Sequence, residues 1–117
     1  MTYVDGYVLA VPTAKREDYR KVAETCARVF KKHGALGVME CWADDVPDGK
    51  LTSFPMAVKC QDDESVVFAW ALWPSRAARD VGNSRVIEEL GTMFEPGDMP
   101  FDGKRMIFGG FEPIVEA

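Results

Sequence analysis

The stretch VVFAWALW, residues 66–73, is the most apolar segment of the chain. Its β-branched and aromatic residues are typical of a strand, in which successive side chains point to opposite faces of a sheet. This alternation gives two sets of side chains, with Val66, Phe68, Trp70 and Leu72 on one face and Val67, Ala69, Ala71 and Trp73 on the other. Both sets are apolar. A sheet that contains this strand therefore needs cover on both sides.

Two long helices are expected, one on each side of this segment in the sequence. Apolar residues at helical spacing (Tyr19, Val22, Ala23, Cys26 and Phe30) predict a helix over residues 15–33, which Gly34 ends. A second helix over residues 76–90 is predicted to be capped by Ser75 and to stop at Gly91, although its apolar stripe is poor. The other strands are predicted at residues 4–11, 35–43 and 105–115, with a short helix capped by Thr52 or Ser53 before the third strand.

The order of these elements is β-α-β-(short helix)-β-α-β, in two halves of similar plan. It predicts an α+β fold of the ferredoxin-like split βαβ class: a sandwich in which a four-stranded antiparallel sheet has its two main helices on one face. The other face would be bare, and a bare apolar face of that size is a liability in a soluble monomer. We therefore expect residues 1–117 to form one domain that pairs with a second copy, sheet against sheet, as a dimeric α+β barrel.

Composition and charge exclude several classes of protein. With 47% hydrophobic and 28% charged residues, the chain has the balance of a globular protein. Its net charge of −5 argues against a nucleic-acid partner, which would require a basic stripe. No apolar stretch is long enough for a membrane span and no secretory pattern opens the chain, so no membrane partner is expected. Three cysteines without a C-x-x-C pair indicate reduced thiols and a cytoplasmic location.

Several tracts resemble one known family. They are YVDGYVLAVP (3–12), KKHGALGVMECWADDVPDGKLTSFPMAVK (31–59), DDESVVFAW (62–70) and MPFDGKRMIFGGFEPIV (99–115). The chain is similar in these tracts to the YbaA-like family of small bacterial proteins of unknown function. The resemblance implies a dimeric α+β barrel and no established reaction. Other dimeric α+β barrels include cofactor-free monooxygenases, haem-handling proteins and lactone isomerases, an analogy of fold alone.

Two titratable residues are candidate catalytic groups. His33, the only histidine, lies on the apolar stripe at the end of the first helix and has a side chain suited to proton transfer near neutral pH. The alternative is a histidine that simply completes the helix end. Glu40 shares a strand face with Leu36, Val38 and Trp42, where a carboxylate would have a partner or a raised pKa. The alternative is an edge-strand glutamate that reaches water.

Candidate ligand-binding residues are aromatic and basic. Trp42, Trp70 and Trp73 lie near strand ends, where they could line an apolar cavity or simply fill the core. Lys104 and Arg105 precede the last strand and could meet an anionic group at the mouth of such a cavity, or serve only solubility. No zinc or calcium spacing is present, so no metal site is predicted.

These observations leave the function open among three classes. The first is a small-molecule binder, including a cofactor-free enzyme, with a pocket between sheet and helices. The second is a non-catalytic module that senses a metabolite. The third is a structural partner protein with a filled interior. The sequence identifies neither a ligand nor a cofactor.

Overall fold

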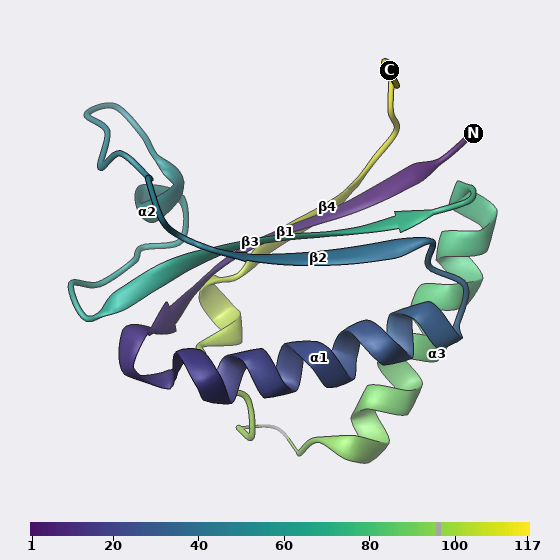
Figure 1. Cartoon of the computed structure of the whole chain (residues 1–117), viewed down its shortest axis with the longest axis horizontal. Helices are drawn as coiled ribbons and strands as arrows, with labels where there is room; N and C mark the ends of the chain where they lie inside the picture. Colours follow the sequence, from purple (N-terminus) through teal and green to yellow (C-terminus); the bar gives the residue numbers. More distant parts are fainter. Residues whose placement is uncertain (96) are drawn as a thin grey trace.

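Four strands and two long helices form a two-layer sandwich in the computed structural model, which describes residues 1–95 and 97–117 (Figure 1). Both α1 and α3 lie on one side of the sheet, whereas α2 lies on the other side (Figure 1). In chain order the elements are β1 (Tyr3–Pro12), a 3-10 turn (Thr13–Lys15), α1 (Arg16–Lys32), β2 (Gly37–Trp42), α2 (Phe54–Ala57), β3 (Glu64–Trp73), α3 (Arg76–Met93), a second 3-10 turn (Gly103–Arg105) and β4 (Ile107–Phe111).

The sheet has the strand order β2-β3-β1-β4, and every neighbouring pair is antiparallel. This is the ferredoxin-like order, so the predicted α+β class and split βαβ plan are confirmed. The register places Val38, Glu40 and Trp42 of β2 opposite Ala71, Ala69 and Val67 of β3. Because opposite residues share a face, these side chains all lie toward the helices.

Several predicted boundaries were wrong: β2 is shorter than predicted, β3 begins at Glu64, β4 ends at Phe111, and two further differences have a clear physical cause. The second long helix continues through Gly91 to Met93, because a glycine ends a helix only when it adopts a left-handed conformation, and Gly91 stays helical. The last strand begins at Ile107 rather than at residue 105, since the preceding residues form a 3-10 turn in which the side chain of Asp102 accepts a hydrogen bond from the Lys104 backbone N–H at 3.0 Å.

The predicted helix caps are confirmed. The Ser53 hydroxyl accepts from the Met56 backbone N–H at 3.1 Å, and the Ser75 hydroxyl accepts from the Ala78 backbone N–H at 3.0 Å. Gly34 follows α1 with φ +109°, a left-handed conformation that favours glycine. None of the helices in the described parts of the chain has the length and apolar composition needed to cross a membrane.

The core lies mainly between the sheet and the two long helices. At one end Tyr19 and Ala23 of α1 pack on β1 and β3, and at the other end Val29 of α1 and Val86 of α3 enclose Trp73. A smaller cluster lies on the opposite face beside α2, formed by Val8, Ala10, Val58 and Val66. Elsewhere on that face Met39, Ile107 and Phe111 are exposed.

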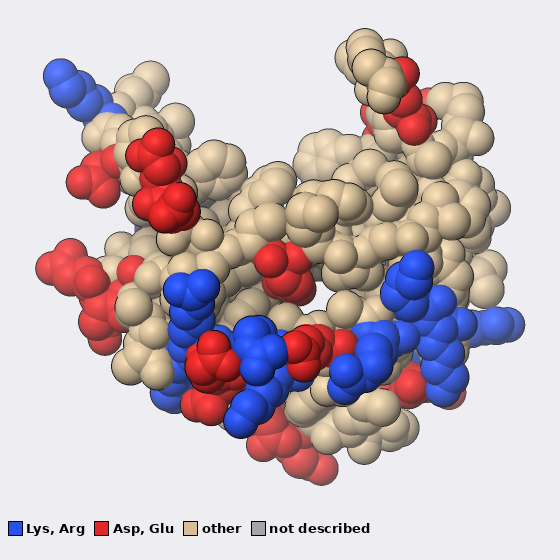
Figure 2. All heavy atoms as spheres, in the orientation of Figure 1, with Lys and Arg blue, Asp and Glu red and all other residues tan. Residues whose placement is uncertain are grey.

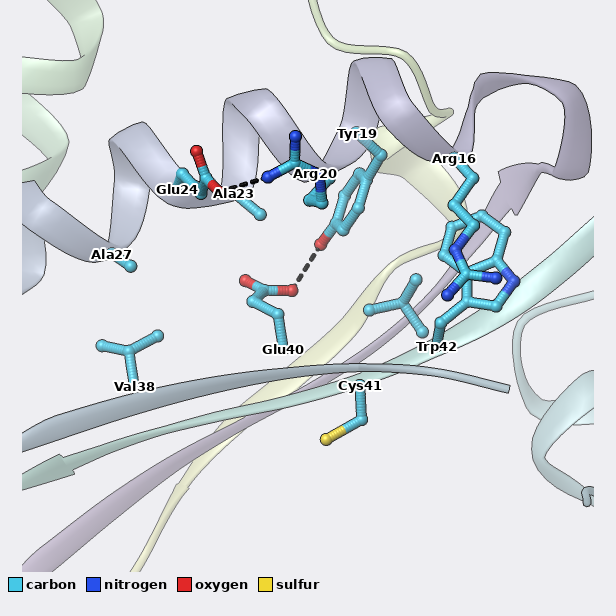
Figure 3. A pocket seen from close by; sticks show the side chains of 11 residues that line it. Arg16, Tyr19, Arg20, Ala23, Glu24, Ala27, Val38, Glu40, Cys41 and Trp42 are labelled. Carbon is cyan, nitrogen blue, oxygen red and sulfur yellow. Dashed lines mark hydrogen bonds and ion pairs between the residues drawn. The ribbon is translucent and has the colours of Figure 1, made fainter. Parts of the chain in front are cut away.

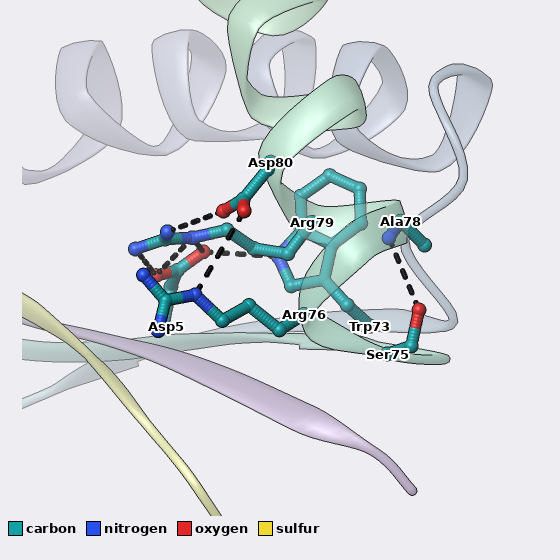
Figure 4. Close-up of polar contacts among 7 residues, drawn as sticks. All are labelled: Asp5, Trp73, Ser75, Arg76, Ala78, Arg79 and Asp80. Atoms are coloured by element: carbon teal, nitrogen blue, oxygen red, sulfur yellow. Dashed lines mark hydrogen bonds and ion pairs between the residues drawn. The ribbon is translucent and has the colours of Figure 1, made fainter.

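Helix α3 is held against the sheet by a buried polar cluster (Figure 4). Asp5 is only 4% exposed; its Oδ2 accepts from Trp73 Nε1 at 3.0 Å, and its Oδ1 accepts from Arg79 Nη2 at 2.9 Å. One turn further, Gly82 lets the helix approach closely. A Cβ there would lie 2.6 Å from the His33 carbonyl oxygen and would overlap the Trp73 ring. Gly82 lowers the intrinsic helix propensity of α3, but it allows the helix to pack closely against Trp73 and the end of α1.

Alanine substitutions at the two glycines of α3 should therefore have opposite effects. Gly82→Ala should destabilise the fold by about 1–3 kcal/mol, because the new methyl group overpacks a rigid backbone and ring. Gly91→Ala meets nothing within 4 Å and should stabilise by roughly 0.5–1 kcal/mol through helix propensity. Urea unfolding of both variants measures the difference. Equal stabilisation by both would show that α3 does not pack on Trp73 in this way.

Candidate functional site

Two adjoining cavities separate α1 from the sheet. The inner cavity has a volume of about 340 Å³ and lies between the sheet, α1 and α3, with Leu9, Phe30, Val38, Ala69, Phe101 and Phe108 among its walls. The outer cavity, of about 400 Å³, lies between α1 and β2, with Arg16, Glu24 and Trp42 among its walls. Tyr19, Ala23, Ala27, Val38 and Glu40 line both. The two spaces therefore meet along α1 and the middle of β2, where Figure 2 shows the molecule hollowed.

Glu40 occupies this junction (Figure 3). Its side chain points from β2 toward α1, and the Tyr19 hydroxyl donates a hydrogen bond of 2.7 Å to its Oε1. Among the described residues, Tyr19 is the only hydrogen-bond partner of this carboxyl. The second oxygen, Oε2, is thus available to a bound molecule. Val38 and Trp42 flank Glu40 on the same face of the strand, so its surroundings along β2 are apolar.

Crowding by protein atoms changes the proton affinity of this pair. Glu40 is exposed to solvent at the cavity, yet the protein around its carboxyl displaces part of its hydration, and this partial burial raises the pKa of the carboxyl. The hydrogen bond from Tyr19 partly opposes that rise. Burial also raises the pKa of Tyr19, and the negative charge of Glu40 adds to the effect. The tyrosine therefore stays protonated and donates, while the carboxyl is a stronger base than usual.

Two other titratable groups of the inner cavity stay neutral near pH 7. Burial, followed by the charge of Asp5, raises the pKa of Tyr7 to about 12. Burial and the charge of Glu40 raise the pKa of the Cys26 thiol to about 11, which makes it a poor nucleophile. This leaves Glu40 as the candidate base among the described residues that line the inner cavity.

Trp42 and Arg16 form the rim of the outer cavity (Figure 3). Trp42 lies near Tyr19, with ring centroids 6.5 Å apart, and the Arg16 guanidinium carbon lies 5.4 Å from the centre of the Trp42 ring. Such a stack orients a guanidinium at modest energetic gain. Trp42 therefore lines the outer cavity.

The other two tryptophans are placed differently. Trp73 is fully buried in the core, and its indole N–H is used by Asp5. Trp70 borders the inner cavity from a strand position whose side chain alternates to the opposite face of the sheet. The structure therefore does not gather the three tryptophans around one space.

His33 is not brought together with Glu40. It ends α1, and its Nε2 lies 2.8 Å from Glu89 Oε1 of α3, which Lys32 also contacts at 2.9 Å. These contacts hold the pKa of Glu89 below its usual range, the hydrogen bond from Lys32 contributing most. His33 lines neither cavity. His33 therefore links the end of α1 to α3 through Glu89.

The predicted basic pair also lies elsewhere. Arg105 binds Glu64 through two hydrogen bonds of 2.7 Å and donates to the Lys59 carbonyl at 2.9 Å, so its guanidinium is already occupied. Lys104 is exposed on the 3-10 turn, and neither residue lines the two cavities. In contrast, Tyr19 and Arg16 were not among the predicted site residues. One signal for these residues was present in the sequence: Tyr19 is the polar member of an otherwise apolar helix stripe.

Comparison with known proteins assigns the chain to a family. Residues 2–103 match the family described as "Protein of unknown function (DUF1428)". The chain belongs to this family. The uncharacterized protein YbaA of Escherichia coli K12 is 53% identical over 117 residues, with 99% of each chain covered, and YbaA of Shigella flexneri matches to the same extent. The predicted membership in a YbaA-like family of unknown function is thus confirmed.

A solved structure with low sequence identity shares the fold. Rv0793 from Mycobacterium tuberculosis superposes with a TM-score of 0.60 at 12% identity, covering 100% of this chain and 99% of that chain. This likeness supports the α+β architecture and says nothing of the chemistry.

Replacing Glu40 with glutamine should change stability in a pH-dependent way. Because the folded-state pKa of Glu40 is raised, its contribution to stability is fully present below its unfolded pKa and is lost as pH rises through the folded value. Glu40→Gln retains an acceptor for Tyr19 and should melt at a higher temperature than the wild type at pH 7, with the gap closing below about pH 4. Differential scanning calorimetry measures this.

The matched control is Glu24→Gln, on the rim of the outer cavity, where Glu24 pairs with Arg20 on the exposed face of α1. It should give no such gain at pH 7. A Glu40→Gln melting temperature that differs from the wild type by the same amount at every pH would contradict the raised pKa.

Proposed function

We propose that this protein binds a small, largely apolar molecule between its sheet and its long helices, with the Glu40 carboxylate as the group that accepts a proton or hydrogen bond from it. The observation that carries this proposal is the Glu40–Tyr19 pair at the junction of two cavities. A carboxylate with a raised pKa in an apolar cleft is a frequent feature of functional sites.

The shape and lining of the inner cavity support an apolar ligand. Its volume of about 340 Å³ lies within the range of about 300–1,000 Å³ for small-molecule sites. Aromatic and aliphatic side chains from α1, α3 and the sheet form most of its walls, and Phe101, which packs edge-on to Tyr19 with ring centroids 5.8 Å apart, closes it near the Glu40–Tyr19 pair. Walls of this composition are best suited to bind a flat aromatic ring system.

The chemistry at Glu40 supports a ligand with one proton-donating group. Oε1 is taken by Tyr19, and a ligand hydroxyl, N–H or activated C–H can approach Oε2. Above its raised pKa, the ionised carboxylate is a general base of more than ordinary strength. The Tyr19 hydroxyl holds the carboxylate in place without competing for the proton, because its own pKa is raised.

The same proposal includes a homodimer formed through the open face of the sheet. Met39, Phe68, Ile107 and Phe111 on that face are between 43% and 62% exposed. The segment around α2 and the C-terminal tail rise beside it, and they carry the exposed apolar residues Leu51 and Ile114 (Figure 1). A second copy, related by a two-fold axis, would present the same patch and cover both. A patch of this kind is unusual on a monomer.

Binding of 2-naphthol tests the ligand proposal, because this neutral bicyclic ring carries a single hydroxyl donor. Isothermal titration calorimetry near neutral pH should detect binding, and Glu40→Gln should weaken it about tenfold through loss of a charge-assisted hydrogen bond. Ala27→Phe places a ring in the junction and should abolish binding. Ala77→Phe, the same change at an exposed α3 position outside both cavities, should not.

Absence of any binding, or equal binding by wild type and Ala27→Phe, would refute the cavity as a ligand site. Binding that ignores Glu40→Gln would refute the role given to Glu40.

Sedimentation tests the dimer. At micromolar concentration the wild type should sediment with twice the chain mass of 13.0 kDa. Phe68→Glu and Phe111→Glu should each give monomers, since burying an unpaired charge costs several kcal/mol. Val81→Glu, which alters an apolar residue of α3 that is 55% exposed, should remain dimeric. A folded wild-type monomer would overturn this part of the proposal.

A further inference from the structure

We infer that the ligand carries an anionic group, of the carboxylate class, in addition to its proton-donating group, and that Arg16 at the rim of the outer cavity binds it. This inference rests on the proposed function and narrows its ligand to small ring acids that bear a hydroxyl group. It is carried by the charge and placement of the side chains around the outer cavity.

Arg16 is held at the rim by an aromatic partner from the other layer. It is the first residue of α1, and its guanidinium lies over the ring of Trp42 at the end of β2, 5.4 Å from the ring centre. Figure 3 shows both side chains together at one end of the outer cavity, with Glu40 and Val38 toward the other. A planar guanidinium fixed in this way has a fork of donors that suits a carboxylate.

Among the described residues that line the outer cavity, Arg16 is the cation without an ion-pair partner. Arg20, the other arginine of this wall, is engaged by Glu17 at 2.8 Å and by Glu24. Arg16 forms no hydrogen bond or ion pair with any side chain in residues 1–95 and 97–117, and its contact with Trp42 does not neutralise it. In a chain of net charge −5, such a cation beside an apolar space is well placed to attract an anion.

The position of Glu40 fixes the orientation of such a ligand. A carboxylate beside Glu40 would be repelled by it, because like charges at short range are unfavourable. The ligand anion therefore lies at the Arg16 end of the outer cavity, and the hydroxyl lies at Glu40, where this cavity meets the inner one. A ligand with both groups at opposite ends of a rigid ring satisfies both residues at once.

A matched pair of probes separates this inference from the proposal on which it rests. 6-Hydroxy-2-naphthoate adds one carboxylate to 2-naphthol at the far end of the ring system. Calorimetry should show that it binds the wild type about tenfold more tightly than 2-naphthol does. Arg16→Gln should remove this advantage, weakening the acid about tenfold while 2-naphthol changes by less than about twofold.

Two further variants test whether the effect belongs to Arg16 itself. Lys15→Gln removes the same charge from the preceding exposed residue, which lines neither cavity, and should change both affinities by less than about twofold. Arg16→Lys keeps the charge but loses the planar fork and the stack, so it should retain only part of the advantage. Because Arg16 is exposed, these variants should melt close to the wild-type temperature.

The outcomes distinguish the two claims. If 2-naphthol binds and responds to Glu40→Gln but the carboxylate adds no affinity, the inference fails while the proposed function stands. Equal losses for both probes in Arg16→Gln, or equal effects of Arg16→Gln and Lys15→Gln, also overturn it. If neither probe binds, both claims fail.

Discussion

The Asp5 carboxylate determines where α3 lies, and the rest of the helix layer follows from that. The apolar stripe of α3 is poor, so hydrophobic burial alone gives the helix no strong preference for one face. Asp5 supplies a fixed point, since it accepts from Trp73 Nε1 within the sheet and from Arg79 of the helix. The charged pair is nearly enclosed, and removal of either partner would leave the other poorly compensated. Gly82, one turn later, then admits the Trp73 ring and the end of α1.

This anchoring at one end accounts for the cavity at the other. α3 touches the sheet around Arg79, Gly82 and Val86, while Ile87 remains 65% exposed although it lines the inner cavity. Close-packed interiors leave few voids larger than a water molecule. A space of about 340 Å³ between apolar walls thus departs from ordinary core packing, and it borders the C-terminal part of α3, which runs away from the sheet (Figure 1). The space follows from how the second helix is attached.

The sequence predicted the parts of the fold that depend on local pattern. The alternation in residues 66–73, the helical spacing from Tyr19 to Phe30 and the serine caps each required only neighbouring residues. The parts it could not predict depend on pairs distant in the chain. Asp5 with Arg79, His33 with Glu89 and Arg105 with Glu64 are 74, 56 and 41 residues apart. Of the residues that line the cavities, Glu40 stood out in the sequence as a carboxylate in an apolar strand and Trp42 as a tryptophan near a strand end, whereas Arg16 has no local anomaly.

Both sequence interpretations of Glu40 describe the same physical arrangement. As an edge strand, β2 pairs only with β3, so water reaches its outer side. α1 nevertheless lies over the face that carries Glu40, and it brings Tyr19 within 2.7 Å of the carboxyl. An edge position without the overlying helix would leave an ordinary solvated carboxylate. A base that is partly desolvated and still reachable requires both features. The middle of β2 provides both features, and Arg16 and Trp42 lie at the rim of the outer cavity beside it.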